Sequence, residues 1–243
     1  MAFNTGGHII TDNLVALVDA ANPKSYPDPT GNVWYNLADG RVRNYINYLG
    51  VGVSGSGATQ RIVFDGSSDY MQYVGCPTSL QGDPNFSVFG AFYRTSDYNS
   101  GGVWGFGTDS SLDGFGAWNS TGDNNLIAMD LWGTTTYSAG SETYPINEWV
   151  LVHWVKTAGT YANTSLTIWV NDKPYTGGDL TTLRGGAGDP TIGSNGMSLG
   201  RTGYSTNNYY APVDIGFIAF YDKVLSGTEV INNFNAKRTR YGI

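Results

Sequence analysis

The 243-residue chain has few of the residues on which covalent and metal chemistry depend. It contains one cysteine, Cys76, and two histidines, His8 and His153. A lone cysteine excludes an internal disulfide, and we expect Cys76 to pack as a small apolar residue. The chain has no Cys/His spacing typical of a metal site and no GxxxxGK[ST] phosphate-binding loop. We therefore expect no cofactor.

Charged residues and long apolar runs are also scarce. Only 14% of the residues are charged, and the formal net charge is −7. An acidic chain without a large basic patch cannot displace counterions from phosphates, so a nucleic-acid partner is not expected. No apolar run approaches the length of a membrane span. Met1–Asn13 lacks the basic and apolar regions of a secretory signal, which predicts a soluble product made in the cytoplasm.

Glycine and aromatic residues are plentiful. There are 34 glycines, and 14% of the residues are aromatic, a composition typical of short strands joined by tight turns. Such strands, with turn signals between them, predict an all-β sandwich or jelly roll. Apolar patterns place strands at 14–18, 86–93, 103–106, 126–132, 149–156 and 166–170, the last two as a hairpin. The polar stretch 108–125 and the turn-rich stretch 177–196 are expected to be loops.

The last thirty residues predict a strand, a turn and one short helix. Residues 214–221 are apolar on both faces, which is typical of a buried strand. Ser226 and Glu229 have the spacing of a capping box, and Leu225 with Val230 has the spacing of a hydrophobic staple. We expect a helix over 226–238 and a tail over 239–243, in a single domain spanning 1–243 with an N-terminal arm over 1–12.

Several segments together resemble a known family. They are LVALVDAANPKSYP, FDGSSDY at 64–70, FSVFGAFYRT, NEWVLVHWVKT, LTIWVNDKPYTGG and the final strand and helix. This order is similar to the laminin-G-like jelly rolls of the concanavalin A-like lectin/glucanase superfamily. The resemblance implies two packed antiparallel sheets, with the first and last strands side by side and the termini close together. The opening LVDAANPKSYP and the ending NFNAKRTRYGI resemble, more narrowly, such domains in structural proteins of tailed bacteriophages, especially cyanophages.

Catalytic residues of that superfamily are not found here. Its glucanases carry two glutamates, with an aspartate between them, on one strand, and retaining glycosidases need two carboxylates about 5 Å apart. The three glutamates, Glu142, Glu148 and Glu229, do not lie on one predicted strand face. Many relatives have a histidine directly after the tryptophan of the central strand, whereas here it comes later, at His153, so no role is transferred. We expect His153 to be a hydrogen-bonded core residue, and we expect no enzymatic activity.

Calcium is the metal for which the sequence offers candidate ligands. Relatives often bind it through Asp and Asn oxygens on rim loops, as a hard cation requires. Asp109, Asp113, Asp123 and Asn124 gather in one loop, while Asp65 and Asp69 share the FDGSSDY turn. The same residue types are common in tight turns because they bond to nearby backbone. The turn role suffices for Asp65 and Asp69, and no metal site is assigned.

Aromatic residues in or beside polar loops are the candidate contact residues. They are Trp118, Trp132, Tyr137, Tyr204, Tyr209 and Tyr210. Such side chains stack on sugar rings, anchor protein interfaces or simply pack their own loops. The sequence leaves these three alternatives open. Trp104, Trp149, Trp154 and Trp169 lie on predicted strands and are expected in the core.

Two functions fit these observations. The first is a non-enzymatic virion component of a bacteriophage, such as a capsid decoration protein or a tail or fibre accessory protein. It would contact other virion proteins, with a homo-oligomer and weak host-surface glycan binding as further options. The arm 1–11, or the basic end with Lys237, Arg238 and Arg240, would dock it; charge complementarity at a helix C-terminus is the alternative role of those cations. The second function is a secreted or cell-attached carbohydrate-binding lectin or adhesin.

Overall fold

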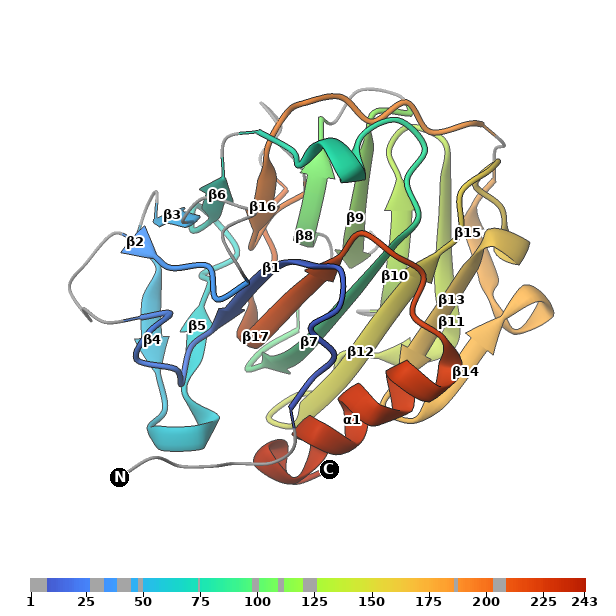
Figure 1. Cartoon of the computed structure of the whole chain (residues 1–243). Coiled ribbons are helices and arrows are strands. Elements are labelled where there is room, and N and C mark those ends of the chain that lie inside the picture. Colours follow the sequence, from blue (N-terminus) through green and yellow to red (C-terminus); the bar gives the residue numbers. More distant parts are fainter. Residues whose placement is uncertain are drawn as a thin grey trace.

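The protein folds as a two-sheet antiparallel sandwich in the computed structural model, as expected (Figure 1). The structure describes residues 8–26, 33–38, 45–47, 50–73, 75–97, 101–108, 112–119, 126–185, 188–202 and 209–243. Within these ranges the only α-helix is α1 (Gly227–Tyr241), and the 3-10 helices are η1 (Gly57–Thr59), η2 (Thr78–Leu80), η3 (Asn163–Ser165) and η4 (Gly177–Asp179). No helix in the described part of the chain is long and apolar enough to cross a membrane.

The first sheet, here called sheet A, is built around the last strand. It contains β1 (Leu14–Asp19), β4 (Gly52–Ser54), β5 (Arg61–Val63), β7 (Phe86–Arg94), β12 (Trp149–Lys156), β13 (Leu166–Val170), β14 (Lys173–Thr176) and β17 (Val213–Tyr221). The strand order is β14-β13-β12-β7-β17-β5-β4, and β1 also pairs with β17. The expected pairing of the first and last strands and the expected β12–β13 hairpin are both confirmed.

The second sheet, here called sheet B, includes strands in stretches that were expected to be loops. It contains β2 (Val33–Trp34), β3 (Tyr45–Asn47), β6 (Met71–Tyr73), β8 (Gly101–Gly107), β9 (Gly114–Asn119), β10 (Leu126–Leu131), β11 (Thr135–Thr143), β15 (Thr181–Arg184) and β16 (Met197–Leu199). Its order is β15-β11-β10-β9-β8-β16-β6-β3-β2. The loop predictions were wrong for β9 and β15, because pairing with β8, β10 and β11 outweighs the low strand propensity of glycine and polar residues.

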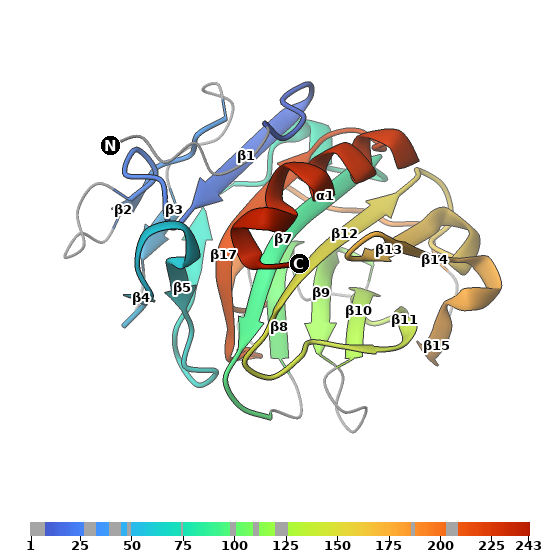
Figure 2. The ribbon, with the colours of Figure 1, turned by 90° about the horizontal axis from the view of Figure 1, so that it is seen from below.

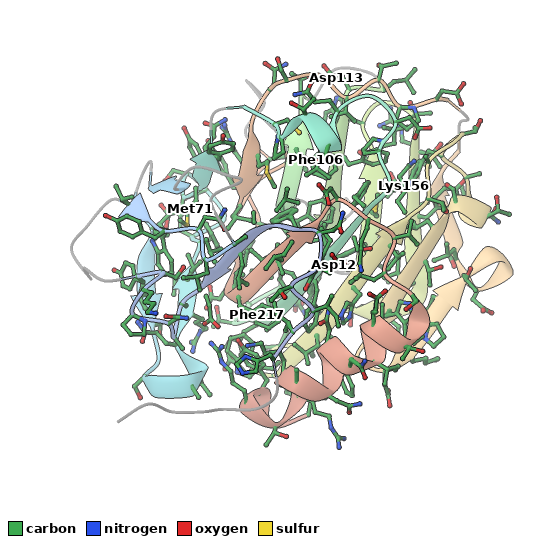
Figure 3. The ribbon with its side chains drawn as sticks, viewed as in Figure 1. Asp12, Met71, Phe106, Asp113, Lys156 and Phe217 are labelled. Carbon is green, nitrogen blue, oxygen red and sulfur yellow. The ribbon has the colours of Figure 1, made fainter. Side chains whose placement is uncertain are left out.

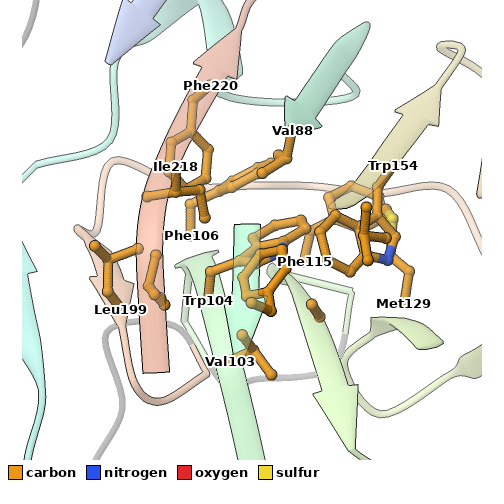
Figure 4. Packing of buried hydrophobic residues seen from close by; sticks show 14 of the residues in the cluster. Val88, Val103, Trp104, Phe106, Phe115, Met129, Trp154, Leu199, Ile218 and Phe220 are labelled. Atoms are coloured by element: carbon orange, nitrogen blue, oxygen red, sulfur yellow. The ribbon is translucent and has the colours of Figure 1, made fainter. Parts of the chain in front are cut away.

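The inner faces of the two sheets enclose the main hydrophobic core. Trp104 of sheet B and Trp154 of sheet A are fully buried there, with ring centroids 5.4 Å apart in an edge-to-face arrangement (Figure 4). Both were expected in the core. Cys76 is buried among apolar residues, as expected, and burial raises the pKa of its thiol to about 12. Edge-to-face aromatic pairs add about 0.5–1.5 kcal/mol to the burial of their area.

Helix α1 covers the outer face of sheet A and forms a second, smaller core. It lies across β7, β12 and β17 (Figure 2). The capping box is confirmed: Ser226 Oγ accepts from the Glu229 amide, and a Glu229 carboxylate oxygen accepts from the Ser226 amide. Leu225 and Val230, the predicted staple, are both buried in this core. The helix runs to Tyr241, beyond the expected end at 238, and Gly242 caps it in the left-handed conformation (φ 74°).

The described part of the N-terminal arm packs on the same corner. The Ile10 amide donates to Asn233 Oδ1 of α1 at 2.7 Å, and the Tyr221 hydroxyl donates to the Ile10 carbonyl at 3.0 Å. Ile9 is buried in the α1 core, the same cluster that contains Phe217; Phe217 and the nearby Asp12 of the arm are labelled in Figure 3. Residues 9 and 10 therefore belong to the fold itself. The first seven residues of the predicted docking arm lie outside the described residues.

A buried ion pair ties the end of α1 to the first strand. Arg240 donates through two nitrogens to the Asp19 carboxylate at 2.6 and 2.8 Å, and its Nε donates to the Ala58 carbonyl at 2.6 Å. Arg240 is 8% exposed and Asp19 7%. Removing one partner of such a buried pair costs about 3–5 kcal/mol, because the other charge is left uncompensated. The contacts of Arg240 therefore hold the end of the helix, the first strand and the η1 turn together.

His153 lies in the core between sheet A and α1, but it is not hydrogen-bonded as expected. It is fully buried and stacks on Phe89 with ring centroids 3.7 Å apart. Neither ring nitrogen has a hydrogen-bond partner in the described part of the chain. Burial holds the pKa of His153 well below its ordinary value of 6.5. The imidazole is therefore neutral and acts as an aromatic packing group.

We predict that His153 makes the protein sensitive to mild acid. Since its pKa is depressed in the folded state, the unfolded chain takes up the proton first as the pH falls below about 6.5, and stability is lost by up to about 1.4 kcal/mol per pH unit. The free energy of unfolding in urea of wild type and His153→Leu should differ by less than about 1.5 kcal/mol at pH 7.5. At pH 5.5 the free energy of unfolding of the variant should rise relative to that of wild type.

The exposed His8 provides the control, because His8→Gln removes a histidine without changing a buried site. A constant difference between wild type and His153→Leu from pH 7.5 to pH 5.5 would contradict the assignment.

Candidate binding pocket on the outer face of sheet B

The structure brings only some of the candidate aromatic residues together. Trp132, on the turn after β10, packs against the exposed Tyr209 with ring centroids 5.3 Å apart. Tyr137 lies on β11 rather than in a loop; it is 7% exposed and packs edge-to-face on Tyr161 in the main core. Tyr210 is 8% exposed and contacts Tyr70. Trp132 and Tyr209 thus form the aromatic contact that remains near the surface.

Two other aromatic candidates are described in part or not at all. Trp118 lies on β9 opposite Ala128 of β10, but its side chain is outside what the structure describes. Tyr204 lies outside the described residues. Contact roles for both remain predictions.

A row of polar residues and glycines crosses the outer face of sheet B. Along β10, Met129 and Leu131 point into the main core, so Asp130 between them points to the opposite face. The ladder then places Asp130 beside Thr136 on one side and Gly116 on the other. The row continues through Gly105, Ser198 and Gln72. The face away from the core is therefore polar and lacks side chains at its centre.

A pocket opens beside this row. It is lined by Thr108, Gly114, Phe115, Gly116, Asp130, Trp132 and Thr202. Its enclosed space has room for about one water-sized group, and the empty volume of about 220 Å³ around it includes space open to solvent. The glycines bring backbone into its floor: a Cβ on Gly114 would lie 2.0 Å from the Thr108 carbonyl oxygen, and one on Gly116 2.8 Å from that of Trp104. Larger residues cannot replace them without moving the walls.

Asp130 supplies the charge of the pocket. It is 5% exposed, and its carboxylate accepts one described side-chain hydrogen bond, from Thr136 Oγ1 at 2.6 Å. Burial raises the pKa of Asp130 to about 6, although the Thr136 bond and the charge of Arg184 act in the opposite direction. Near neutral pH the group is ionised in a site that disfavours its charge. Such a group is typical of functional sites.

Thr202 adds a second polar group without a partner. Its hydroxyl is buried and makes no hydrogen bond within the described part of the chain. The segment that carries it is held by the Arg201–Tyr210 bridge and by a bond from the Ala211 amide to the Gly200 carbonyl. An unsatisfied buried hydroxyl costs about 1–3 kcal/mol.

Trp132 is held in place by backbone contacts with the neighbouring strand and turn. Its amide donates to the Gly114 carbonyl at 2.9 Å, and its carbonyl accepts from Leu112 at 3.0 Å. Asp113, on the side of the molecule away from α1 (Figure 3), accepts from the Thr108 hydroxyl and from the Gly193 amide. Contacts with the neighbouring strand and turn thus position this wall of the pocket.

The FDGSSDY turn has the structural role expected of it. One Asp65 carboxylate oxygen accepts from the amides of Ser67, Ser68 and Asp69 at 2.8–2.9 Å. These hydrogen bonds outweigh the effect of burial and hold the pKa of Asp65 below its usual value. Asp109, Asp123 and Asn124 of the other acidic loop lie outside the described residues. The described part of the chain holds no group of three His, Cys, Asp or Glu residues that could bind a metal.

The three basic docking candidates differ in their availability. Arg240 is buried in its pair with Asp19, so the prediction that it docks on a partner conflicts with its place in the fold. Lys237 has its ammonium 4.0 Å from Asp19 and 5.2 Å from the centre of the Phe217 ring. Arg238 is exposed. A docking role stays a prediction for Lys237 and Arg238, whereas internal pairing accounts for Arg240.

Asp130 and Thr202 were not among the sequence-based candidates. A signal for Asp130 was present: it is the one charged residue in the apolar strand Leu126–Leu131, and unpaired acids are rarely buried. Thr202 carried no such signal, since its burial results from a backbone segment that crosses the glycines of β8 and β9.

We predict that Asp130→Asn stabilises the protein at neutral pH. The folded state binds this proton more tightly than the unfolded chain, so the carboxyl contributes stability below about pH 4 that is lost as the pH rises through 6. A pKa raised by about two units corresponds to about 3 kcal/mol. The variant keeps an oxygen acceptor for Thr136. It should be about 2–3 kcal/mol more stable than wild type in urea unfolding at pH 7.5 and equal to it near pH 4.

Asp172→Asn, at an exposed turn, changes the net charge equally and should shift stability by less than about 0.5 kcal/mol. An Asp130→Asn variant that is less stable than wild type at pH 7.5 would show that the carboxylate is structural.

Comparisons with known proteins show the fold alone. No family model and no curated protein matches the chain. Among solved structures it is similar to Trypanosoma rangeli sialidase in complex with sialic acid (TM-score 0.59, 12% identity), covering 97% of this chain and 35% of the sialidase. The chain thus spans about a third of that protein. Domain 4 of a GH43 extracellular arabinanase from Geobacillus stearothermophilus, in complex with arabinotriose, has a TM-score of 0.61 and 11% identity, with 91% and 98% covered. The botulinum neurotoxin serotype C1 binding domain has a TM-score of 0.57 and 11% identity, with 93% and 52% covered.

Proposed function

We propose that the chain is a carbohydrate-binding domain whose ligand lies over Trp132 and reaches Asp130 with a single hydroxyl group in the pocket on the outer face of sheet B. The observation that carries the proposal is the Asp130 carboxylate, which is buried beside Trp132 on the face away from the core. Hydrophobic packing alone does not account for a buried charge at the position of Asp130. A ligand hydroxyl group adds a donor to the one that Thr136 already supplies.

The pocket combines the two kinds of contact that sugars use. The carboxylate of Asp130 accepts hydrogen bonds from sugar hydroxyls. The indole of Trp132 offers an apolar surface with a polar edge, which suits the apolar face of a sugar ring. Small-molecule sites typically pair such an apolar wall with a few placed polar groups. The fold is shared with an arabinanase domain bound to arabinotriose, which supports this proposal without carrying it.

We propose binding without catalysis. Glycosidases position two carboxyl groups on either side of the bond that they cleave. Among the described lining residues, Asp130 is the one acid. Glu229 caps α1 and Glu142 accepts from the Tyr175 hydroxyl, so both serve other contacts. Glu148 is exposed at the turn before β12.

A role in a bacteriophage virion stays a prediction from the sequence resemblance. It is compatible with glycan binding, since a virion protein can contact its host through sugars. Mass spectrometry of purified virions that encode this chain would test it. Absence of the chain from the particles would rule the role out.

We predict that the full chain binds a subset of a glycan array and that Trp132→Ala weakens this binding. Loss of the stacking surface should raise the dissociation constant at least tenfold by calorimetry, equivalent to about 1.4 kcal/mol. Tyr35→Ala is the matched control, because Tyr35 is an aromatic residue 42% exposed beside β2. It should leave the dissociation constant unchanged. A blank array, or equal losses in both variants, would overturn the proposal.

A further inference from the structure

We propose that the pocket on sheet B selects neutral sugars and rejects sugars that carry a carboxylate, with Asp130 as the residue that sets this specificity. The inference rests on the proposed function and adds the class of ligand. It comes from the charges placed around the pocket.

No arginine or lysine is among the described residues that line the pocket, so Asp130 is the one formal charge there. The cation that acts on it, Arg184 of β15, is exposed and lies opposite Thr136, one strand further along the ladder. Arg201 lies over the Tyr70 ring at 3.8 Å and is not part of the lining. A ligand carboxylate would therefore meet Asp130 in the lining itself, while the cation Arg184 lies outside the lining on an exposed strand.

The hydrogen-bonding chemistry leads to the same result. An ionised aspartate is an acceptor only, and one donor, Thr136, already occupies Oδ1. The remaining lone pairs accept from sugar hydroxyls. A sugar carboxylate also only accepts, so the two groups cannot bond to one another, and both lose water on contact. Specificity of this kind depends on an unfavourable contact with the wrong ligand.

Protonation of Asp130 should relax the selection. The titratable groups that act on it in the described part of the chain are Arg184 from β15 and, across the sheet, the buried Tyr161. Neither changes charge between pH 5 and pH 7.5, since arginine stays protonated and burial raises the pKa of Tyr161 well above 10. With a pKa of about 6, Asp130 becomes a neutral donor in this range.

The test compares matched pairs of methyl glycosides that differ only at C6: glucoside with glucuronide, and galactoside with galacturonide. Dissociation constants are measured by ligand-detected NMR or calorimetry on the full chain at pH 7.5 and pH 5. For the pair that the protein recognises, we expect the neutral sugar to bind at least tenfold more tightly at pH 7.5. The ratio should fall several-fold at pH 5.

Two variants separate this effect from general electrostatics. Asp130→Asn keeps the shape of the side chain without its charge, and its neutral-to-acidic ratio should fall to within about threefold and lose its pH dependence. Asp172→Asn makes the same change in net charge at an exposed turn and should keep the wild-type ratio. Circular dichroism of both variants confirms folding.

The outcomes distinguish the two proposals. Binding of neutral and acidic sugars with equal affinity, or a ratio unchanged in Asp130→Asn, overturns the inference and leaves carbohydrate binding standing. No binding of any glycan, on the array or in solution, overturns the proposed function and this inference with it.

Discussion

The burial of β17 on both faces is the constraint on which the rest of the structure depends. All nine of its residues are buried. Ile218 and Phe220 fill the core between the sheets, while Phe217 and Ala219 fill the core under α1. Its two edges pair with β7 on one side and with β1 and β5 on the other. A strand apolar on both faces can exist only between two layers, so the helix and the arm follow from it.

Gly216 shows how closely the helix must approach this strand. A Cβ there would lie 2.6 Å from the Tyr241 hydroxyl and 2.9 Å from the Trp149 ring. Because Gly216 has no side chain, the end of α1 packs directly on the sheet. The Asp19–Arg240 pair holds it there. One outer face of the sandwich is thereby covered, and two of the buried titratable groups, His153 and Asp130, lie on opposite outer faces. Burial under α1 keeps His153 neutral, whereas burial on the outer face of sheet B raises the pKa of Asp130 to about 6.

Much of the fold could be predicted because its signals are local. The capping box at Ser226, the apolar run of β1 and the two-faced β17 depend on neighbours in the sequence. The strands β9 and β15 could not be found in this way, because glycine and polar residues form them only when partners on both sides are present. For the same reason, the residues of the candidate site could not be found from the sequence. Asp130, Trp132 and Thr202 come together through the sheet ladder and a segment that crosses it, and no spacing in the sequence records that approach.

The pocket and the main core nevertheless both depend on one strand, β10. Along β10, core and pocket residues alternate, so a slip of one position would move Met129 into the pocket and Asp130 into the core. The irregularity between Leu126 and Ala128 in the pairing with β11 ends before this stretch, and the ladder from Ala128 to Leu131 is regular on both sides. The hydrophobic packing that stabilises the sandwich therefore also fixes the position of the Asp130 carboxylate, whose charge is disfavoured by burial. A charge held at that cost by the strand that secures the core is the observation on which the proposed ligand rests.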